Sequence, residues 1–272
     1  MLQRIELQDG RTLTINDPNN DKQPVVSVHG LTGNHMQLKY FQDYFKDDRF
    51  ITYDLSGRGQ SDFNSQTSIS HHANDLLELL DILSLNDVIL VGYSIGAYIC
   101  AEAAAKSDKV GKLVLLDGAG YADDDQQVMI SNSLLRLSKS YNSQEDYINE
   151  TKISFEKAGI EWTEHHRKFA EYESNKTSNG WESKMDVKLL KQDYDTFFYF
   201  QHSKILSEIN VPTLLIIAKG NMGQRPLFLE ESFNVVEDNI TNLQVEETSA
   251  NHLTLVFNQQ PEVFKQIEKF IK

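Results

Sequence analysis

Ser94 is the residue whose setting in the sequence most directly indicates chemistry. It lies in the string Gly-Tyr-Ser-Ile-Gly at 92–96, between the apolar run 88–91 and the small-residue run 97–105. This order predicts a strand, a sharp turn and a helix, and a serine at such a turn holds its hydroxyl above the sheet in a strained backbone conformation. We therefore predict that Ser94 is a nucleophile. The simpler alternative is that it caps the helix.

His252 is the best candidate for a base beside that serine. A serine hydroxyl is a poor nucleophile at neutral pH, so it needs a base within hydrogen-bond distance and a third group that orients the base. The chain has eight histidines. His252 follows a strand predicted at 243–245 and precedes a helix predicted at 261–271, which places it at the carboxyl end of the sheet. His71 and His72 are expected to be capping or surface groups; the alternative is that no histidine is catalytic.

Ser94 and His252 can meet only if a sheet brings the ends of their strands together, and the sequence predicts such a sheet. Strand and helix patterns alternate over 1–119 and again over 206–272, so we expect an α/β core domain with a mostly parallel sheet flanked by helices. Residues 4–7 and 11–16, on either side of Asp9-Gly10, are expected to form an edge hairpin with a two-residue turn.

The alternation stops between residues 120 and 205. This region has helical spacing, a polar break at 174–180 and no convincing strand, so we interpret it as an inserted helical cap. Its aromatic residues could line a pocket above the serine, or could only pack the cap against the sheet domain. With Tyr93 beside the serine, the predicted substrate-binding residues are Tyr93, Trp162, Trp181, Phe197 and Phe198.

Composition excludes several classes of partner. The chain has 26 basic and 40 acidic residues, a formal charge of −14, which would repel nucleic-acid phosphates and anionic membrane surfaces. Cys100 is the only cysteine, so no intrachain disulfide can form, and we expect it to be buried. The amino terminus has no apolar signal segment, so we expect a cytoplasmic protein. The acidic run 123–125 is expected to begin a helix; no metal and no cofactor are predicted.

Several motifs together identify a family resemblance. They are His29-Gly30 after a strand, Asp-Leu-Ser-Gly-Arg-Gly-Gln-Ser at 54–61, the Ser94 string, Val211-Pro212 opening a late strand, and Asn251-His252. In these motifs the chain resembles the capped, esterase-like branch of the α/β-hydrolase superfamily. The resemblance implies a three-layer α/β-hydrolase fold with an oxyanion hole made by the backbone N–H groups of Leu31 and Ile95. Asp54, Arg58 and Asp75 belong to the shared motifs and are expected to stabilise loops.

The acid of the expected triad departs from the family pattern. Its usual position, after the strand at 211–217, holds Asn221, which carries no charge to stabilise an imidazolium. Asp117 ends the strand after the nucleophile helix, where some branches of the superfamily place the acid, so we predict that it orients His252. The alternatives are that Asp117 only opens a turn or that a cap carboxylate such as Asp186 substitutes.

The sequence therefore predicts a serine hydrolase. The expected substrate is a small molecule with an apolar portion, cleaved at a carboxylic ester or amide through an acyl-enzyme. Two alternatives remain at this stage. One is hydrolysis of a carbon–carbon bond on the same scaffold; the other, motivated by Asn221, is a small-molecule receptor with little turnover.

Overall fold

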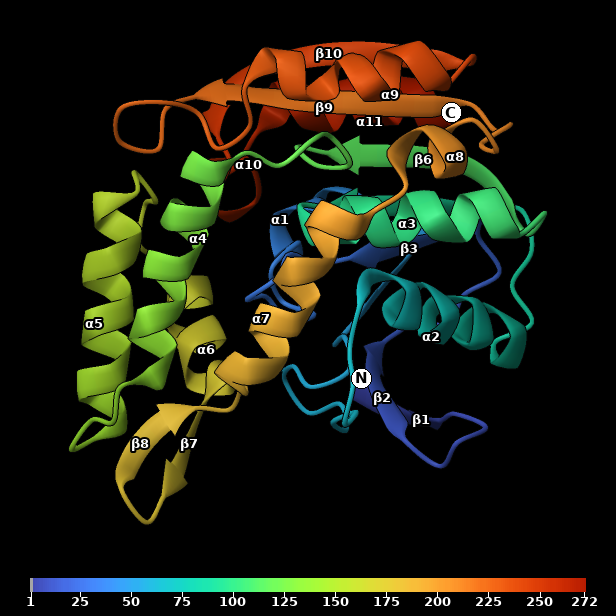
Figure 1. The fold of residues 1–272 in the computed structure, drawn as a ribbon. Coiled ribbons are helices and arrows are strands. Elements are labelled where there is room, and N and C mark those ends of the chain that lie inside the picture. Colours follow the sequence, from blue (N-terminus) through green and yellow to red (C-terminus); the bar gives the residue numbers. More distant parts are fainter. Residues whose placement is uncertain (1) are drawn as a thin grey trace.

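An eight-stranded sheet runs through the molecule in the order β1-β2-β4-β3-β5-β6-β9-β10 (Figure 1). The computed structural model describes residues 2–272. β1 and β2 pair antiparallel, as do β2 and β4, and every other neighbouring pair is parallel. The strands are β1 (Leu2–Glu6), β2 (Thr12–Asn16), β3 (Pro24–Val28), β4 (Arg49–Tyr53), β5 (Val88–Tyr93), β6 (Val110–Leu116), β9 (Thr213–Gly220) and β10 (Leu243–Asn251). The predicted mostly parallel α/β sheet is confirmed.

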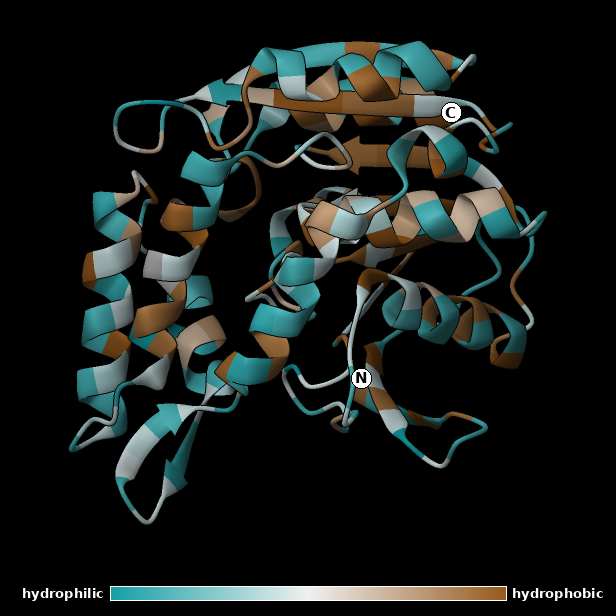
Figure 2. Cartoon of the chain, in the orientation of Figure 1, coloured by the Kyte–Doolittle hydropathy of each residue, from teal (hydrophilic) through white to brown (hydrophobic). Residues whose placement is uncertain are grey.

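Helices cover both faces of the sheet and make three layers. In β5, Leu90 packs in the same apolar cluster as α2 (Ile69–Ile82) and α3 (Ile95–Lys106), whereas Ile89 and Val91 pack with α1 (Lys39–Tyr44) and α11 (Pro261–Ile271). This alternation follows from side chains pointing to opposite faces along a strand. β6 and β9 are largely brown in Figure 2, as expected for strands buried on both sides.

The edge hairpin has a longer loop than predicted. Register pairs Glu6 with Thr12, so the loop spans 7–11 and not the two residues of a tight turn. Leu7 is buried in the core, and its N–H donates to the carbonyl of Arg11 at 2.7 Å. Leu7 lies on the same face as Ile5, so its burial continues the alternation of β1 beyond the last ladder pair.

Residues 124–206 form a run of helices, most of which stand beside the sheet, whereas the helix at 202–206 packs against α3 of the sheet domain (Figure 1). They are α4 (Asp124–Leu135), the 3₁₀ turn η1 (Arg136–Ser138), α5 (Gln144–Lys157), α6 (Glu164–Glu173), α7 (Val187–Asp195), the 3₁₀ turn η2 (Thr196–Tyr199) and α8 (His202–Leu206). The expected polar break is instead a hairpin of β7 (Ser174–Thr177) and β8 (Gly180–Ser183). Gly180, at φ +128°, permits the tight reversal between these two strands. We retain 120–205 as the proposed limits of the cap.

A buried ion pair ties α7 to the sheet domain. Arg58 Nη2 lies 2.5 Å from Asp193 Oδ2, and both side chains are almost completely buried. Thr67 Oγ1 donates to the other carboxylate oxygen at 2.5 Å, and His72 Nε2 lies 3.0 Å from Asp193 Oδ2. His72 is therefore a buried partner of Asp193 and not the surface group expected. Burial raises the pKa of Asp193, but Arg58, His72 and Thr67 together outweigh this effect and hold the pKa below its ordinary value.

A second contact ties α6 to the sheet domain. The Tyr172 hydroxyl donates to Asp54 Oδ2 at 2.5 Å, while His35 Nδ1 lies 2.9 Å from Oδ1 of the same carboxylate. Asp54 also accepts hydrogen bonds from the backbone N–H groups of His35 and Gln60. The carboxylate therefore fixes its own loop, as expected, and also fixes the cap. In residues 2–272 no helix combines the length and apolar character needed to cross a bilayer.

Candidate active site

Ser94 sits at the turn between β5 and α3 in the strained conformation that its motif predicts. Its φ and ψ are 56° and −122°, and its side chain makes no capping hydrogen bond, so helix capping does not explain the serine. A Cβ on Gly92 would lie 2.2 Å from the carbonyl oxygen of Gly96, and one on Gly96 would lie 2.2 Å from that of Val28. Only glycine therefore lets the strand, turn and helix approach this closely.

His252 and Asp117 converge on Ser94 from two other strand ends. His252 directly follows β10, and its Nε2 is 3.2 Å from Ser94 Oγ. Asp117 directly follows β6, and its Oδ2 is 2.7 Å from His252 Nδ1. A carboxylate at Nδ1 favours the tautomer with its proton there, which leaves Nε2 free to accept the serine proton.

Further hydrogen bonds hold Asp117 and His252 in place. The other oxygen of Asp117 accepts a hydrogen bond from the N–H of Ala218 at 3.0 Å. The Tyr93 hydroxyl donates to the His252 carbonyl at 2.8 Å, and the two rings stack with centroids 4.8 Å apart. Asp117 is fully buried. The base and its carboxylate are therefore positioned before any substrate binds.

The other candidates for the acid lie elsewhere. Asn221 is exposed in the loop after β9. Asp186 caps α7 and accepts a hydrogen bond from the N–H of Lys188 at 2.8 Å. Of the three positions considered from the sequence, the structure brings only Asp117 to His252.

The two expected oxyanion donors flank the serine. Ile95 is the first residue of α3, so its N–H has no acceptor within the helix and lies at the positive end of the helix dipole. Leu31 lies in the loop after β3 and lines the same cavity as Ser94. These positions are consistent with a hole formed by two backbone amides.

His29 orients the peptide group that carries the Leu31 N–H. Its Nδ1 lies 2.7 Å from the carbonyl oxygen of Gly30, which belongs to the Gly30–Leu31 peptide. Its Nε2 accepts from the N–H of Leu55 at 3.0 Å, which assigns the ring proton to Nδ1. Burial lowers the pKa of His29 to about 3, so the ring stays neutral and keeps this tautomer. Gln37 adds a second restraint by accepting from the Gly30 N–H at 2.7 Å.

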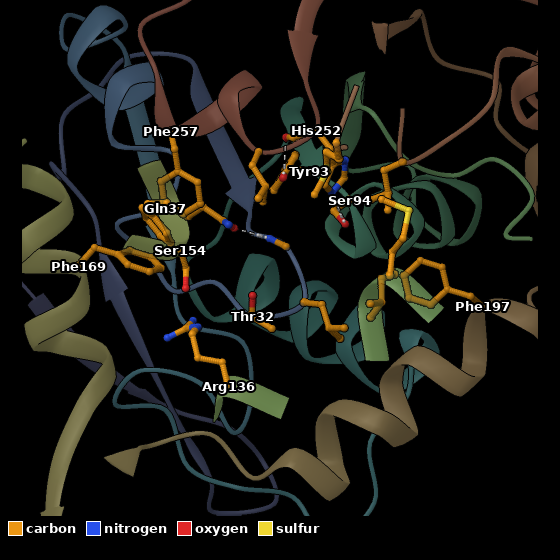
Figure 3. Close-up of a pocket in the computed structure, with 18 residues that line it drawn as sticks. Thr32, Gln37, Tyr93, Ser94, Arg136, Ser154, Phe169, Phe197, His252 and Phe257 are labelled. Atoms are coloured by element: carbon orange, nitrogen blue, oxygen red, sulfur yellow. Dashed lines mark hydrogen bonds between the residues drawn. The ribbon is translucent and has the colours of Figure 1, made fainter. Parts of the chain in front are cut away.

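A cavity of about 320 Å³ opens above Ser94, between the sheet domain and the helices of 124–206 (Figure 3). Tyr93 and Phe197 belong to its wall, together with side chains that sequence analysis did not single out. Those side chains are Thr32, Gln37, Met129, Ile130, Arg136, Ser154, Phe155, Phe169, Met222, Leu227, Leu253 and Phe257. The wall is mainly apolar, with a few polar groups, as is usual for a small-molecule site.

The other three aromatic residues predicted to bind substrate do not belong to this wall. Trp162 packs edge-on against Phe155, with ring centroids 5.9 Å apart. Trp181 pairs with Lys176 in the β7–β8 hairpin, and Phe198 is 41% exposed on the outer side of the helices. Phe155 and Phe169 instead face the cavity. Their helical spacing was visible in the sequence, but the side of each helix that turns inward was not.

Residues 2–272 contain no group of three or more His, Cys, Asp or Glu side chains that could hold a metal ion. The acidic run at 123–125 begins α4, as expected, with Asp123 accepting a hydrogen bond from the N–H of Gln126. Cys100 is buried in α3, and burial raises the pKa of its thiol well above the usual value.

Comparison with known proteins gives a family match over most of the chain. A family model described as alpha/beta hydrolase fold matches residues 23–258. Lipase LipV of Mycobacterium tuberculosis is 27% identical over 141 residues, which cover 52% of this chain and 51% of the lipase. The chain spans about half or less of the length of the curated relatives it matches.

Solved structures share the fold over the whole chain. E-2-(acetamidomethylene)succinate hydrolase superposes with a TM-score of 0.84 at 20% identity, over 100% of this chain and 98% of the other. An esterase of Exiguobacterium antarcticum superposes with a TM-score of 0.73 at 20% identity, over 100% of this chain and 99% of the other. At this level of identity the likeness establishes the fold alone.

Proposed function

The chain belongs to the alpha/beta hydrolase fold family, and on that premise we propose that it is a serine hydrolase acting on a small carboxylic ester or amide. The observation that carries the proposal is the hydrogen-bonded series Ser94–His252–Asp117, formed at the ends of three strands. Nucleophile, base and orienting carboxylate are the groups that acyl transfer through serine requires.

In the proposed reaction Ser94 Oγ attacks the substrate carbonyl while His252 Nε2 takes its proton. The carboxylate of Asp117 stabilises the imidazolium that forms, and the N–H groups of Leu31 and Ile95 stabilise the oxyanion. His252 then donates its proton to the leaving group. Water, deprotonated by the same base, hydrolyses the acyl-enzyme and regenerates Ser94.

The relatives support hydrolysis but leave the bond undecided. Among them are proteins named as a lipase, an esterase and a hydrolase of a substituted succinate. One fold hosts many reactions, so these names do not choose between ester and amide. The alternative of a receptor rested on Asn221, and the contact between Asp117 and His252 supports turnover instead. Hydrolysis of a carbon–carbon bond stays the second candidate, because a relative that is 31% identical over 116 residues is named as a putative 2-succinyl-6-hydroxy-2,4-cyclohexadiene-1-carboxylate synthase and not as an ester or amide hydrolase.

A fluorophosphonate probe tests the proposal directly. We expect intact-mass analysis to show one probe on the wild-type chain and none on Ser94→Ala. Ser70→Ala, which removes an exposed hydroxyl on α2, is the matched control and is expected to label like wild type. Equal labelling of Ser94→Ala and wild type, or no labelling of wild type, would contradict the proposal.

A further inference from the structure

The cavity has a polar end that the proposed reaction does not use. Arg136, in η1 where α4 ends, points its guanidinium into the cavity beside the hydroxyl of Ser154, with Thr32 nearby on the opposite wall (Figure 3). Among the described residues of the wall, Arg136 is the only one with a permanent charge. A guanidinium that faces an otherwise largely apolar cavity is costly unless an anion accompanies it.

Residues of the cap hold Arg136 in this position. Its Nη1 donates to Thr151 Oγ1 on α5 at 3.1 Å, and its guanidinium carbon lies 5.9 Å from the centre of the Tyr147 ring. The side chain is 18% exposed, and Nη2 lies 3.6 Å from Glu173 Oε1 on α6. Two helices therefore fix the direction of the guanidinium.

Glu173 is a weak counter-ion for Arg136. The 3.6 Å separation exceeds hydrogen-bond distance, so the pair lacks the bidentate geometry that makes arginine–carboxylate contacts strong. Burial raises the pKa of Glu173 in spite of the nearby guanidinium. Thr151 uses one of the five N–H donors of the arginine, and the planar fork suits a second carboxylate arriving from the cavity.

We propose that Arg136 binds a carboxylate of the substrate, with Ser154 and Thr32 as neighbouring hydrogen-bonding groups. The substrates would then be half-esters or half-amides of dicarboxylic acids, with the ester or amide at Ser94, the carboxylate at Arg136 and a short apolar chain between them. This inference rests on the proposed function, because it assigns the substrate of the same site. The competing interpretation is that Arg136 only joins α4 to α5 and α6.

Paired substrates separate these interpretations. The half-ethyl esters of succinic, glutaric and adipic acids are each compared with the corresponding diethyl ester in a pH-stat assay. Wild type is expected to prefer the half-ester of the best-fitting length. Arg136→Met is expected to lower the ratio of kcat/KM for half-ester over diester by roughly 10- to 100-fold, the range for a lost charged hydrogen bond. Arg136→Lys should recover part of the ratio, because it keeps the charge but not the fork.

Arg167→Met is the matched control. Arg167 also lies in the cap and pairs with a carboxylate, Glu145, but on the outer surface of α6. Its substitution is expected to leave the ratio unchanged. An unchanged ratio in Arg136→Met, or an equal fall in Arg167→Met, would overturn the carboxylate site.

A binding measurement keeps this inference separable from the proposed reaction. In Ser94→Ala, the half-ester of the best-fitting length is expected to raise Tm more than its diester does, and the added Arg136→Met change is expected to abolish the difference. If fluorophosphonate labelling fails but this difference is present, the reaction is wrong and the carboxylate site stands. If labelling succeeds and none of the three half-esters raises Tm more than its diester, the reaction stands and the carboxylate site falls.

Discussion

The two walls of the cavity come from regions that are built differently. The sheet domain contributes Ser94 and His252 to one wall, with Asp117 buried behind His252, and each of the three directly follows a strand of the same parallel sheet. The helices of 124–206 contribute Arg136, Phe155 and their neighbours, whose positions depend on how helices pack on one another and on the sheet. The wall from the sheet domain is therefore suited to holding reacting groups in fixed positions, and the wall from the helices to selecting a substrate.

Polar contacts join the two regions at both buried and exposed positions. The main ones are the Arg58–Asp193 ion pair and the hydrogen bond from Tyr172 to Asp54. Arg58 also donates from Nε to the carbonyl of Leu31 at 3.2 Å, so one contact reaches both the cap and the proposed oxyanion loop. Weakening these contacts tests how far the two walls depend on one another.

Removing Asp193 is expected to have the largest effect on stability. Asp193→Ala leaves Arg58 buried without its carboxylate, and the free energy of unfolding should fall by about 3–5 kcal/mol, measured by urea denaturation. Asp195→Ala, on the same helix but paired at the surface with Lys191, is the control and should change it by less than about 1 kcal/mol. Equal changes in the two variants would show that the buried pair does not join the regions.

His29 is expected to make the stability of the sheet domain depend on pH. Burial lowers its pKa from 6.5 to about 3, so between these values the unfolded chain binds a proton that the folded chain does not. The contribution of the neutral ring is complete above pH 6.5 and is lost as pH falls toward 3. Relative to His29→Asn, wild type should lose about 1 kcal/mol of unfolding free energy per pH unit in this window. If the free energy of unfolding changed equally with pH in wild type and in His29→Asn, this role of His29 would be refuted.

Tyr172→Phe is expected to have the smallest effect. It removes one hydrogen bond to Asp54, but the carboxylate keeps those from His35 and Gln60. The free energy of unfolding should fall by about 1 kcal/mol. Tyr199→Phe, at a residue that is 80% exposed, is the control and should leave stability unchanged. A loss of several kcal/mol would mean that the cap depends on this contact more than on Asp193.

The sheet domain was largely predictable because local sequence determines it. Gly92 is required by a contact within the Ser94 turn, Gly96 by the close approach of β3, and His252 and Asp117 follow strands whose order the fold dictates. The position expected for the acid is also defined by local sequence, because it follows β9. The absence of an aspartate there, where the chain has Asn221, was therefore visible in the sequence. The loop at 7–11 was missed because Asp9-Gly10 is typical of a two-residue turn, whereas the last ladder pair here is Glu6 with Thr12.

The cap was predictable only as a set of helices. Helical spacing shows that a residue such as Phe155 or Phe169 lies on an apolar face, but not whether that face meets the cavity or another helix. Arg136 carried no signal at all, because a basic residue between Leu135 and Leu137 belongs to no motif. The β7–β8 hairpin is short and hydrophilic, so its strands lack an alternating apolar pattern.

The central claim is that Ser94, His252 and Asp117 act as one unit in which Asp117 replaces the acid absent at Asn221. The most direct test is the kcat of Asp117→Asn and of Asn221→Ala on a p-nitrophenyl ester, with folding checked by urea denaturation. We expect Asp117→Asn to lose about ten-thousand-fold, because an amide neither fixes the tautomer of His252 nor stabilises its charge. Asn221→Ala should retain wild-type kcat. A large loss in Asn221→Ala with little change in Asp117→Asn would contradict the account.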